Sequence, residues 1–125
     1  MALQVTERIS VHDLAVEAAA RMYQVEGYQA LIRHQPRPHR YGRNPFDLFV
    51  PALERVEEVE TAETLPTADL ARLRRCREEG LQVWVLVQLD AVAAAYASLK
   101  GAADHVIPFW ILEGGRVRFG LPRRP

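Results

Sequence analysis

The residues of this sequence with the clearest chemical potential are three carboxylates near its middle, Asp47, Glu58 and Glu60. Like charges that lie close together raise each other's pKa, and burial adds to the rise, so such a cluster costs stability unless a cation fills it. Mg²⁺ typically takes one or two carboxylates together with phosphate oxygens of a substrate. A divalent cation held there would polarise a phosphodiester and bring the pKa of a water molecule close to neutral. The residue types therefore predict metal-dependent hydrolysis of phosphodiester bonds.

Two expected strands joined by a short turn would bring these carboxylates together. The four residues between the strands begin with a proline, which suits the first corner of a type I turn in a hairpin loop. If Val50 pairs with Arg55, the register places Asp47 opposite Glu58, with Cβ atoms about 4.5–5.5 Å apart. Glu60 lies two residues beyond Glu58 and therefore on the same strand face. We expect the three carboxylates to share one patch of a sheet.

The alternative for this acidic strand is that it is simply a solvated face. Some of its acids would then turn outward and pair with Arg55 or with an arginine of the helix that follows. Acidic runs of this kind are solvated strand faces more often than they are sites. The position of a basic segment directly before the acidic strand favours the functional interpretation.

That basic segment, residues 31–44, contains four arginines, two histidines and no acidic residue. Its arginines are Arg33, Arg37, Arg40 and Arg43. We expect them to follow a nucleic-acid backbone, with His34, His39 and Tyr41 adding hydrogen bonds or base stacking. If all four arginines met phosphates of duplex DNA, log K would fall with log salt with a slope of about −3.6. The alternative is a mobile, soluble loop.

The elements that position these residues follow from the pattern of apolar residues and caps. We expect helices over residues 11–25, 67–79 and 89–99, and strands over residues 28–34, 46–50, 55–61, 81–87, 106–112 and 116–119. Ser10 and Thr67 are the expected N-caps of the first two helices. The nearly continuous apolar run at 81–87 predicts a central strand buried on both faces. The order α-β-β-β-α-β-α-β-β predicts one α/β domain over residues 1–125, with a mixed central sheet flanked by helices.

Composition limits the functional classes. The net charge is zero, and no apolar stretch approaches the roughly 20 residues of a membrane-spanning helix, so no membrane partner is expected. Residues 1–7 lack the basic region and apolar run of a secretory signal. The single cysteine, Cys76, falls on the apolar side of its helix and can make no internal disulfide, so the cytoplasm is the expected location. In the terminal hairpin, Phe109, Trp110, Ile111 and Phe119 are expected in the core, with a dimer interface as the alternative.

With this order of elements, the stretches 44–50 (Asn-Pro-Phe-Asp-Leu-Phe-Val) and 56–61 (Val-Glu-Glu-Val-Glu-Thr) resemble the PD-(D/E)XK, or restriction endonuclease-like, nuclease superfamily. The size of the domain and the basic loop before Asp47 are most similar to those of archaeal-type Holliday junction resolvases. The resemblance spans residues 11–89 and implies a restriction endonuclease-like fold. It also implies that Asp47 and Glu58 are catalytic ligands of Mg²⁺ or Mn²⁺ and that a cation-supported water attacks DNA.

The sequence departs from the superfamily pattern at the motif lysine, where it has Glu60. Lys100 is the only lysine of the chain, and it lies at the end of the third expected helix. Some superfamily members carry the basic group on the helix after the motif, which makes Arg72, Arg74 and Arg75 candidates. Arginine is a poor general base because its pKa exceeds about 12. Glu60 itself is a candidate third ligand or base.

Two further positions bear on the resemblance. Phe46, where the superfamily has proline, precedes Asp47. Glu17 lies where members often have another acid, but it falls about 100° from the apolar stripe, which favours a solvated side chain.

The sequence thus leaves three functions open. They are a divalent-metal-dependent DNA endonuclease, a catalytically inactive nuclease-fold module that binds nucleic acid or a protein partner, and a structural subunit. A homodimer is the oligomer that the resemblance implies, because the resolvase-like proteins act on two strands.

Overall fold

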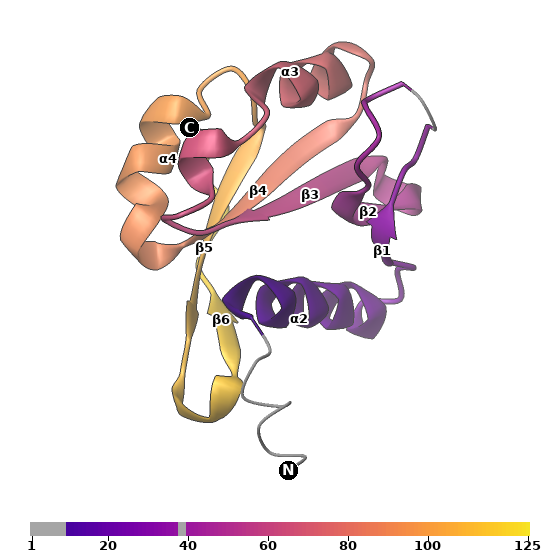
Figure 1. Cartoon of the computed structure of the whole chain (residues 1–125). Coiled ribbons are helices and arrows are strands. Elements are labelled where there is room, and N and C mark those ends of the chain that lie inside the picture. Colours follow the sequence, from indigo (N-terminus) through magenta and orange to yellow (C-terminus); the bar gives the residue numbers. More distant parts are fainter. Residues whose placement is uncertain (1–9, 38–39) are drawn as a thin grey trace.

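A mixed β-sheet runs through the molecule and carries helices on both of its faces (Figure 1). The computed structural model describes residues 10–37 and 40–125 of the chain. Within these residues the sheet has six strands in the order β1-β2-β3-β4-β5-β6. The strands are β1 (Leu31–His34), β2 (Phe46–Val50), β3 (Arg55–Glu60), β4 (Gln82–Gln88), β5 (His105–Ile111) and β6 (Val117–Phe119). The pairs β3–β4 and β4–β5 are parallel, and the other neighbouring pairs are antiparallel.

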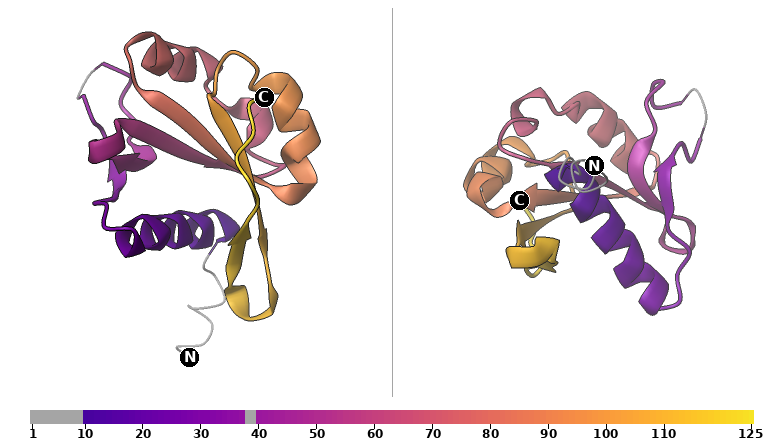
Figure 2. Two further views of the ribbon diagram at one scale, coloured as in Figure 1. Left: turned by 180° about the vertical axis from the view of Figure 1, so that it is seen from behind. Right: turned by 60° about the horizontal axis from the view of Figure 1, so that its bottom comes forward.

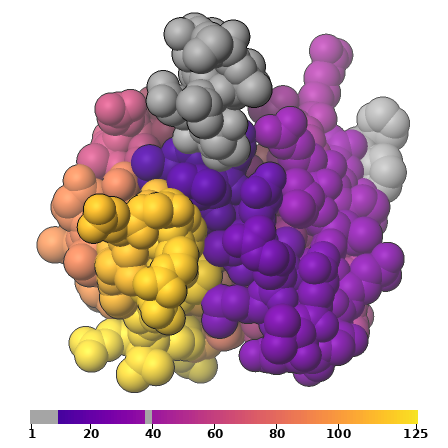
Figure 3. Space-filling model, turned by 90° about the horizontal axis from the view of Figure 1, so that it is seen from below, coloured from indigo at the N-terminus to yellow at the C-terminus, as the bar shows by residue number. Residues whose placement is uncertain are grey.

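The helices divide between the two faces of this sheet. They are α2 (Val11–Val25), α3 (Leu70–Glu78) and α4 (Val92–Ser98). Viewed from behind, α3 and α4 lie on one face and α2 lies on the other (Figure 2). From below, α2 lies beside the β5–β6 hairpin (Figure 3). The expected order α-β-β-β-α-β-α-β-β and the α/β class with a mixed sheet are therefore confirmed.

Each face of the sheet has its own apolar core. Val83, Val85 and Val87 of β4 pack with α3 and α4, whereas Leu86 packs with Phe109 under α2. Successive side chains of a strand point to opposite faces, so a strand covered on both sides must be apolar throughout. The strand expected at residues 81–87 forms at 82–88, and its central residues are buried as expected, although Gln82 is exposed and Trp84 is only partly buried.

The β2–β3 hairpin has the register expected from its turn. Val50 pairs with Arg55 and Leu48 pairs with Glu57. A short 3₁₀ turn, Pro51–Leu53, joins the two strands. Continuation of this register by one residue places Asp47 beside the next residue of β3, which is Glu58.

The start of α3 differs from the expectation that placed its N-cap at Thr67. Residues 65–67 form a separate 3₁₀ turn, and α3 begins after Asp69, whose Oδ1 accepts a hydrogen bond from the Arg72 amide at 3.1 Å. Thr67 Oγ1 instead donates to the Thr64 carbonyl at 3.0 Å. Aspartate is among the strongest N-caps because its carboxylate satisfies a free amide and lies at the positive end of the helix dipole. The β1 strand is also shorter than expected, at 31–34 rather than 28–34.

Replacement of the two N-cap candidates distinguishes them by stability. We expect Asp69→Ala to lower the free energy of unfolding by about 1 kcal/mol because the amide of Arg72 loses its acceptor. The matched change Thr67→Ala, at an exposed residue, is expected to cost less than about 0.5 kcal/mol. Urea denaturation followed by circular dichroism measures both, and a larger loss for Thr67→Ala would contradict the assigned cap.

The remaining predictions about packing can be placed in this fold. Phe109 and Cys76 are fully buried, as expected, whereas Trp110, Ile111 and Phe119 of the terminal hairpin are only partly buried. The dimer interface that was the alternative for this hairpin stays a prediction. None of the described helices has the length and apolar character needed to cross a membrane.

Candidate active site around Asp47 and Glu58

Asp47 and Glu58 meet where β2 begins and β3 approaches its end. The Asp47 amide lies 3.4 Å from Glu58 Oε2, and the Val59 amide donates to Asp47 Oδ2 at 2.8 Å. The two side chains are 17% and 16% exposed. Because ladder pairing stops at Leu48 and Glu57, side chains rather than backbone groups complete the hydrogen bonding at this end of the hairpin. The structure thus brings the two predicted metal ligands together.

Glu58 is a buried acid with weak partners. Its Oε1 lies 3.5 Å from Arg72 Nη1, and its Oε2 lies 3.4 Å from the Asp47 amide. Burial, and then the hydrogen bond and charge of Asp47, raise the pKa of Glu58 to about 10, although Arg72 acts in the opposite direction. Without a cation, Glu58 therefore keeps its proton at neutral pH.

His12 completes the cluster from the first turn of α2, although no motif in the sequence singles it out. Ser10 caps this helix by accepting a hydrogen bond from the Asp13 amide, which fixes where His12 lies. His12 Nε2 lies 2.9 Å from Asp47 Oδ1, and its Nδ1 lies 3.1 Å from Asp13 Oδ1. The hydrogen bond to Asp47 is the main cause that raises the pKa of His12 to about 9. Both ring nitrogens are therefore donors at neutral pH.

The histidine also determines the protonation of Asp47. Burial tends to raise the pKa of Asp47, but hydrogen bonds from His12, Glu58 and the Val59 amide outweigh it and hold the pKa below its ordinary value. The two acids therefore differ, with Asp47 ionised and Glu58 neutral. A pair of neighbouring carboxyls that shares one proton is the usual outcome when like charges lie this close.

Arg72 lies beside Glu58 and ties α3 to the start of β2. Its Nη2 donates to the Asn44 carbonyl, and its guanidinium lies 3.8 Å from the centre of the Phe46 ring. The side chain is 13% exposed, which makes it a buried cation next to the acid pair. Of the three arginines considered as substitutes for the motif lysine, Arg72 alone contacts the cluster. Arg74 and Arg75 are exposed to solvent.

Glu60 borders a small hollow next to the pair. The hollow has a volume of about 200 Å³ and is also lined by Glu58 and Arg72. Burial raises the pKa of Glu60, and the charge of Asp47 adds to the rise, while a hydrogen bond with Thr64 lowers it. All three predicted carboxylates therefore lie at one place on the sheet. Glu17 is exposed on α2, in agreement with a solvated side chain.

The four loop arginines do not act as one group. Arg37 Nη1 donates to Tyr41 Oη at 2.9 Å and to the Glu79 carbonyl at 3.3 Å, and Arg40 pairs with the Glu79 carboxylate at 2.6 Å. Both therefore hold the loop to the C-terminal end of α3, about 10 Å along the helix from Arg72. Arg43 is exposed beside Asn44.

Arg33, which lies in strand β1 and not in the loop, is the arginine of this basic segment whose side chain approaches the cluster. It is 70% exposed and lies 3.6 Å from Asp13 Oδ1, one residue from His12. Its backbone has a positive φ of 53°, which is uncommon outside glycine. Arg33 and Arg43 are both exposed to solvent, and Arg33 lies next to the cluster.

The three other loop residues expected to contact nucleic acid lie differently. Tyr41 is buried and packs edge-on against Phe46, with ring centres 6.2 Å apart, so the expectation that it stacks on a base is wrong. His34 stacks on Phe49 at 5.6 Å. His39 lies outside the described residues.

The donor set can be compared with the needs of a divalent cation. Across residues 10–37 and 40–125, no group of three or more His, Cys, Asp or Glu side chains is arranged to hold a metal ion. Asp47 and Glu58 alone offer two carboxylates, which suits Mg²⁺ because that ion usually keeps several waters. Glu58 makes long contacts with the Asp47 amide and with Arg72, at 3.4 and 3.5 Å. Of the acids in the cluster, it is therefore the one for which a cation would be the best partner.

Comparison with models of protein families, with curated proteins and with solved structures found no match to this chain. The geometry of the cluster is therefore what indicates a function. Its parts are an ionised aspartate, a neutral glutamic acid, a charged histidine and a buried arginine beside a small hollow.

Proposed function

We propose that this protein has a restriction endonuclease-like fold and hydrolyses phosphodiester bonds of DNA with Mg²⁺ or Mn²⁺ held by Asp47 and Glu58. The observation that carries the proposal is the contact between these two acids at adjacent strand ends, with both side chains largely shielded from solvent. A divalent cation that replaced the proton of Glu58 would be held by two carboxylates, the number that Mg²⁺ commonly takes from a protein. The order of elements and the mixed direction of the strands support the same fold.

The chain's own side chains would divide the work of this reaction. When bound, a divalent cation supplies polarisation of the phosphodiester and a lower pKa for a nearby water. His12 donates to Asp47 and fixes the direction of that carboxylate. Arg72 lies where it can stabilise negative charge on a phosphate beside Glu58. Glu60 borders the hollow with a raised pKa, which makes it a better proton acceptor than an ordinary glutamate.

The exposed arginines would bind the DNA backbone. Because Arg37 and Arg40 hold the loop to α3, we expect Arg43 to contribute one phosphate contact and Arg37 none. Arg43→Ala should therefore make the slope of log K against log salt less steep by about 0.9. Arg37→Ala should leave the slope unchanged. Fluorescence anisotropy with labelled duplex DNA over a range of KCl concentrations measures both slopes. Equal changes in the two variants would contradict this division of the loop.

Incubation with DNA tests the proposed activity. The purified protein is mixed with supercoiled, linear and branched DNA in Mg²⁺, in Mn²⁺ and in EDTA, and the products are separated on gels. Cutting that requires the cation and stops in EDTA supports the proposal. Absence of cutting on every substrate in both metals would overturn it.

A catalytically inactive nuclease-fold module is the second candidate, and one observation favours it. An acid, Glu60, stands where the superfamily motif has its lysine, and His12 and Arg72 already neutralise much of the charge of the acid pair. Binding of DNA without cutting in either metal would select this module. Sedimentation of the protein alone and with DNA tests the homodimer.

A further inference from the structure

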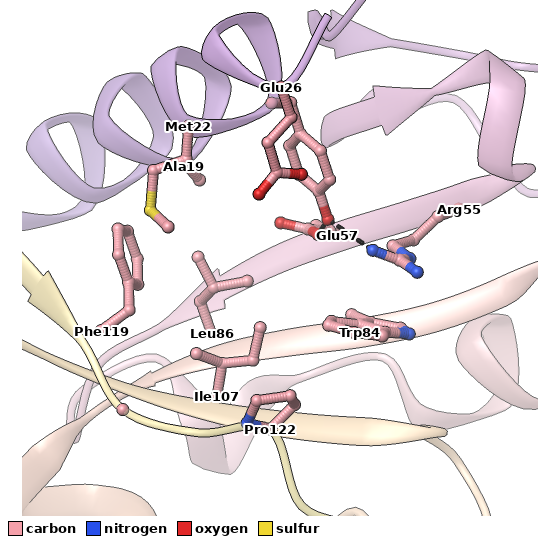
Figure 4. Close-up of a pocket in the computed structure, with 12 residues that line it drawn as sticks. Ala19, Met22, Glu26, Arg55, Glu57, Trp84, Leu86, Ile107, Phe119 and Pro122 are labelled. Atoms are coloured by element: carbon pink, nitrogen blue, oxygen red, sulfur yellow. Dashed lines mark hydrogen bonds between the residues drawn. The ribbon is translucent and has the colours of Figure 1, made fainter. Parts of the chain in front are cut away.

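A second hollow lies between α2 and strands β3 to β6, on the opposite face of the sheet from Glu58 and Glu60. Its volume is about 310 Å³, at the lower end of the range of small-molecule sites. Met22, Leu86, Ile107 and Phe119 give it apolar walls. Figure 4 shows Glu57 near its centre, with Met22, Leu86 and Phe119 on one side. The cavity thus combines an apolar body with one deeply placed acid.

Glu57 is the unusual group of this cavity, because it is a carboxyl that is only 2% exposed. Tyr23 Oη donates a hydrogen bond to Glu57 Oε2. No described residue donates to the other oxygen, Oε1, and Glu57 lines the hollow. This oxygen therefore keeps its capacity to accept a hydrogen bond from a ligand that enters the hollow.

The nearest cation, Arg55, is already engaged. Its Nη1 donates to Tyr23 Oη at 2.8 Å, and its Nε donates to Gln82 Oε1 at 3.0 Å. The guanidinium lies 3.6 Å from the centre of the Trp84 ring, close enough for a cation–π interaction. Arg55 thus acts on Glu57 through Tyr23, and the acid has no direct cationic partner among the described residues.

The electrostatics favour a donor with positive charge. Burial raises the pKa of Glu57 to about 7, although the hydrogen bond from Tyr23 and the charge of Arg55 both act to lower it. A cation that donates to Glu57 would stabilise its ionised form. Glu26 also lines the cavity and lies above Glu57 in Figure 4, where it adds negative charge.

We propose that this hollow binds a small organic amine. Its protonated nitrogen donates to Glu57 Oε1, and its apolar body lies against Met22, Leu86 and Phe119. The site is independent of the acid pair, because Glu57 and Glu58 are consecutive residues of β3 and point to opposite faces. It therefore stands whether or not the protein cuts DNA.

Isothermal titration calorimetry with three molecules of similar size tests this proposal. They are phenethylamine, which is cationic, 2-phenylethanol, which is neutral, and 3-phenylpropionate, which is anionic. We expect phenethylamine to bind at least tenfold more tightly than the other two, because a charge-assisted hydrogen bond to a buried carboxylate exceeds a neutral one. Glu57→Gln, which keeps the side-chain shape, should remove this preference. Glu60→Gln, on the opposite face, should leave it unchanged.

Three results would overturn the proposal. They are no binding of phenethylamine, equal binding of the three molecules, and tighter binding of 3-phenylpropionate, which would assign recognition to Arg55. A second variant keeps the test decisive if Glu57→Gln does not fold. Met22 is 51% exposed on α2, so Met22→Trp should fold and fill the mouth of the hollow. It should weaken phenethylamine binding at least tenfold, and unchanged binding would place the amine elsewhere.

Discussion

Asp47→Asn is expected to lower the rate of metal-dependent DNA cleavage about 1000-fold, which corresponds to about 4 kcal/mol of transition-state stabilisation. The asparagine keeps the size of the side chain and its hydrogen bond with the Val59 amide, but it removes the charge that holds a cation. Initial rates of nicking of supercoiled plasmid in Mn²⁺ and Mg²⁺ measure the effect. Because asparagine has the shape of aspartate and can still accept a hydrogen bond from the Val59 amide, the variant should fold and still bind DNA.

The controls separate loss of chemistry from loss of structure. Glu17→Gln, which changes an exposed acid of α2, should leave the cleavage rate unchanged. His12→Gln keeps a possible donor to Asp47 but loses the positive charge, and we expect a reduction of about 10- to 100-fold, as for other groups that orient a metal ligand. If Asp47→Asn cut DNA as fast as the native protein, the assignment of the acid pair as the catalytic centre would be wrong.

The part of this site that sequence can predict is the part that depends on local rules. A four-residue turn that begins with proline determined the pairing of Val50 with Arg55, and this register placed Asp47 beside Glu58. The apolar run of β4 predicted a strand covered on both faces, because each alternate residue must face a helix layer. In both cases neighbouring residues carry all the information that the prediction needs.

The parts that could not be predicted depend on contacts between distant segments. His12 reaches Asp47 only because α2 starts directly after its N-cap, Ser10, and passes under this end of the sheet. In the same way, Arg37 and Arg40 are held by Glu79, which lies 39 residues beyond Arg40 in the sequence. Exposure of a charged residue is set by such partners, and a basic run alone does not show which of its members are free.

The acid pair should also make the stability of the metal-free protein fall as pH rises. Glu58 has a pKa of about 10 in the folded chain against an ordinary value of 4.5, so folding takes up a proton between these limits. Its contribution is complete below pH 4.5 and is lost as pH rises toward 10. The pKa of His12 is raised from 6.5 to about 9, so its contribution to stability also falls as pH rises between these values. The pKa of Glu57, on the other face of the sheet, is raised to about 7, so its contribution to stability is lost at lower pH than that of Glu58.

Glu58→Gln isolates the largest of these contributions between pH 7 and 9. Glutamine cannot ionise, so folding of the variant takes up no proton at this position, and its stability should fall less steeply with pH. Relative to the native chain, the variant should gain at least about 1.4 kcal/mol between pH 7 and 9, the equivalent of one pKa unit. Urea denaturation in EDTA across this range measures the difference, and Glu57→Gln serves as the matched control because most of its effect lies below pH 7.

Addition of Mg²⁺ should stabilise the native protein most at pH 9, where fewer protons compete for the acid pair, and should not stabilise Glu58→Gln to the same degree. Parallel curves for the native protein and Glu58→Gln from pH 7 to 9 would mean that Glu58 is ionised in the folded state, and the acid pair would then have no need of a cation.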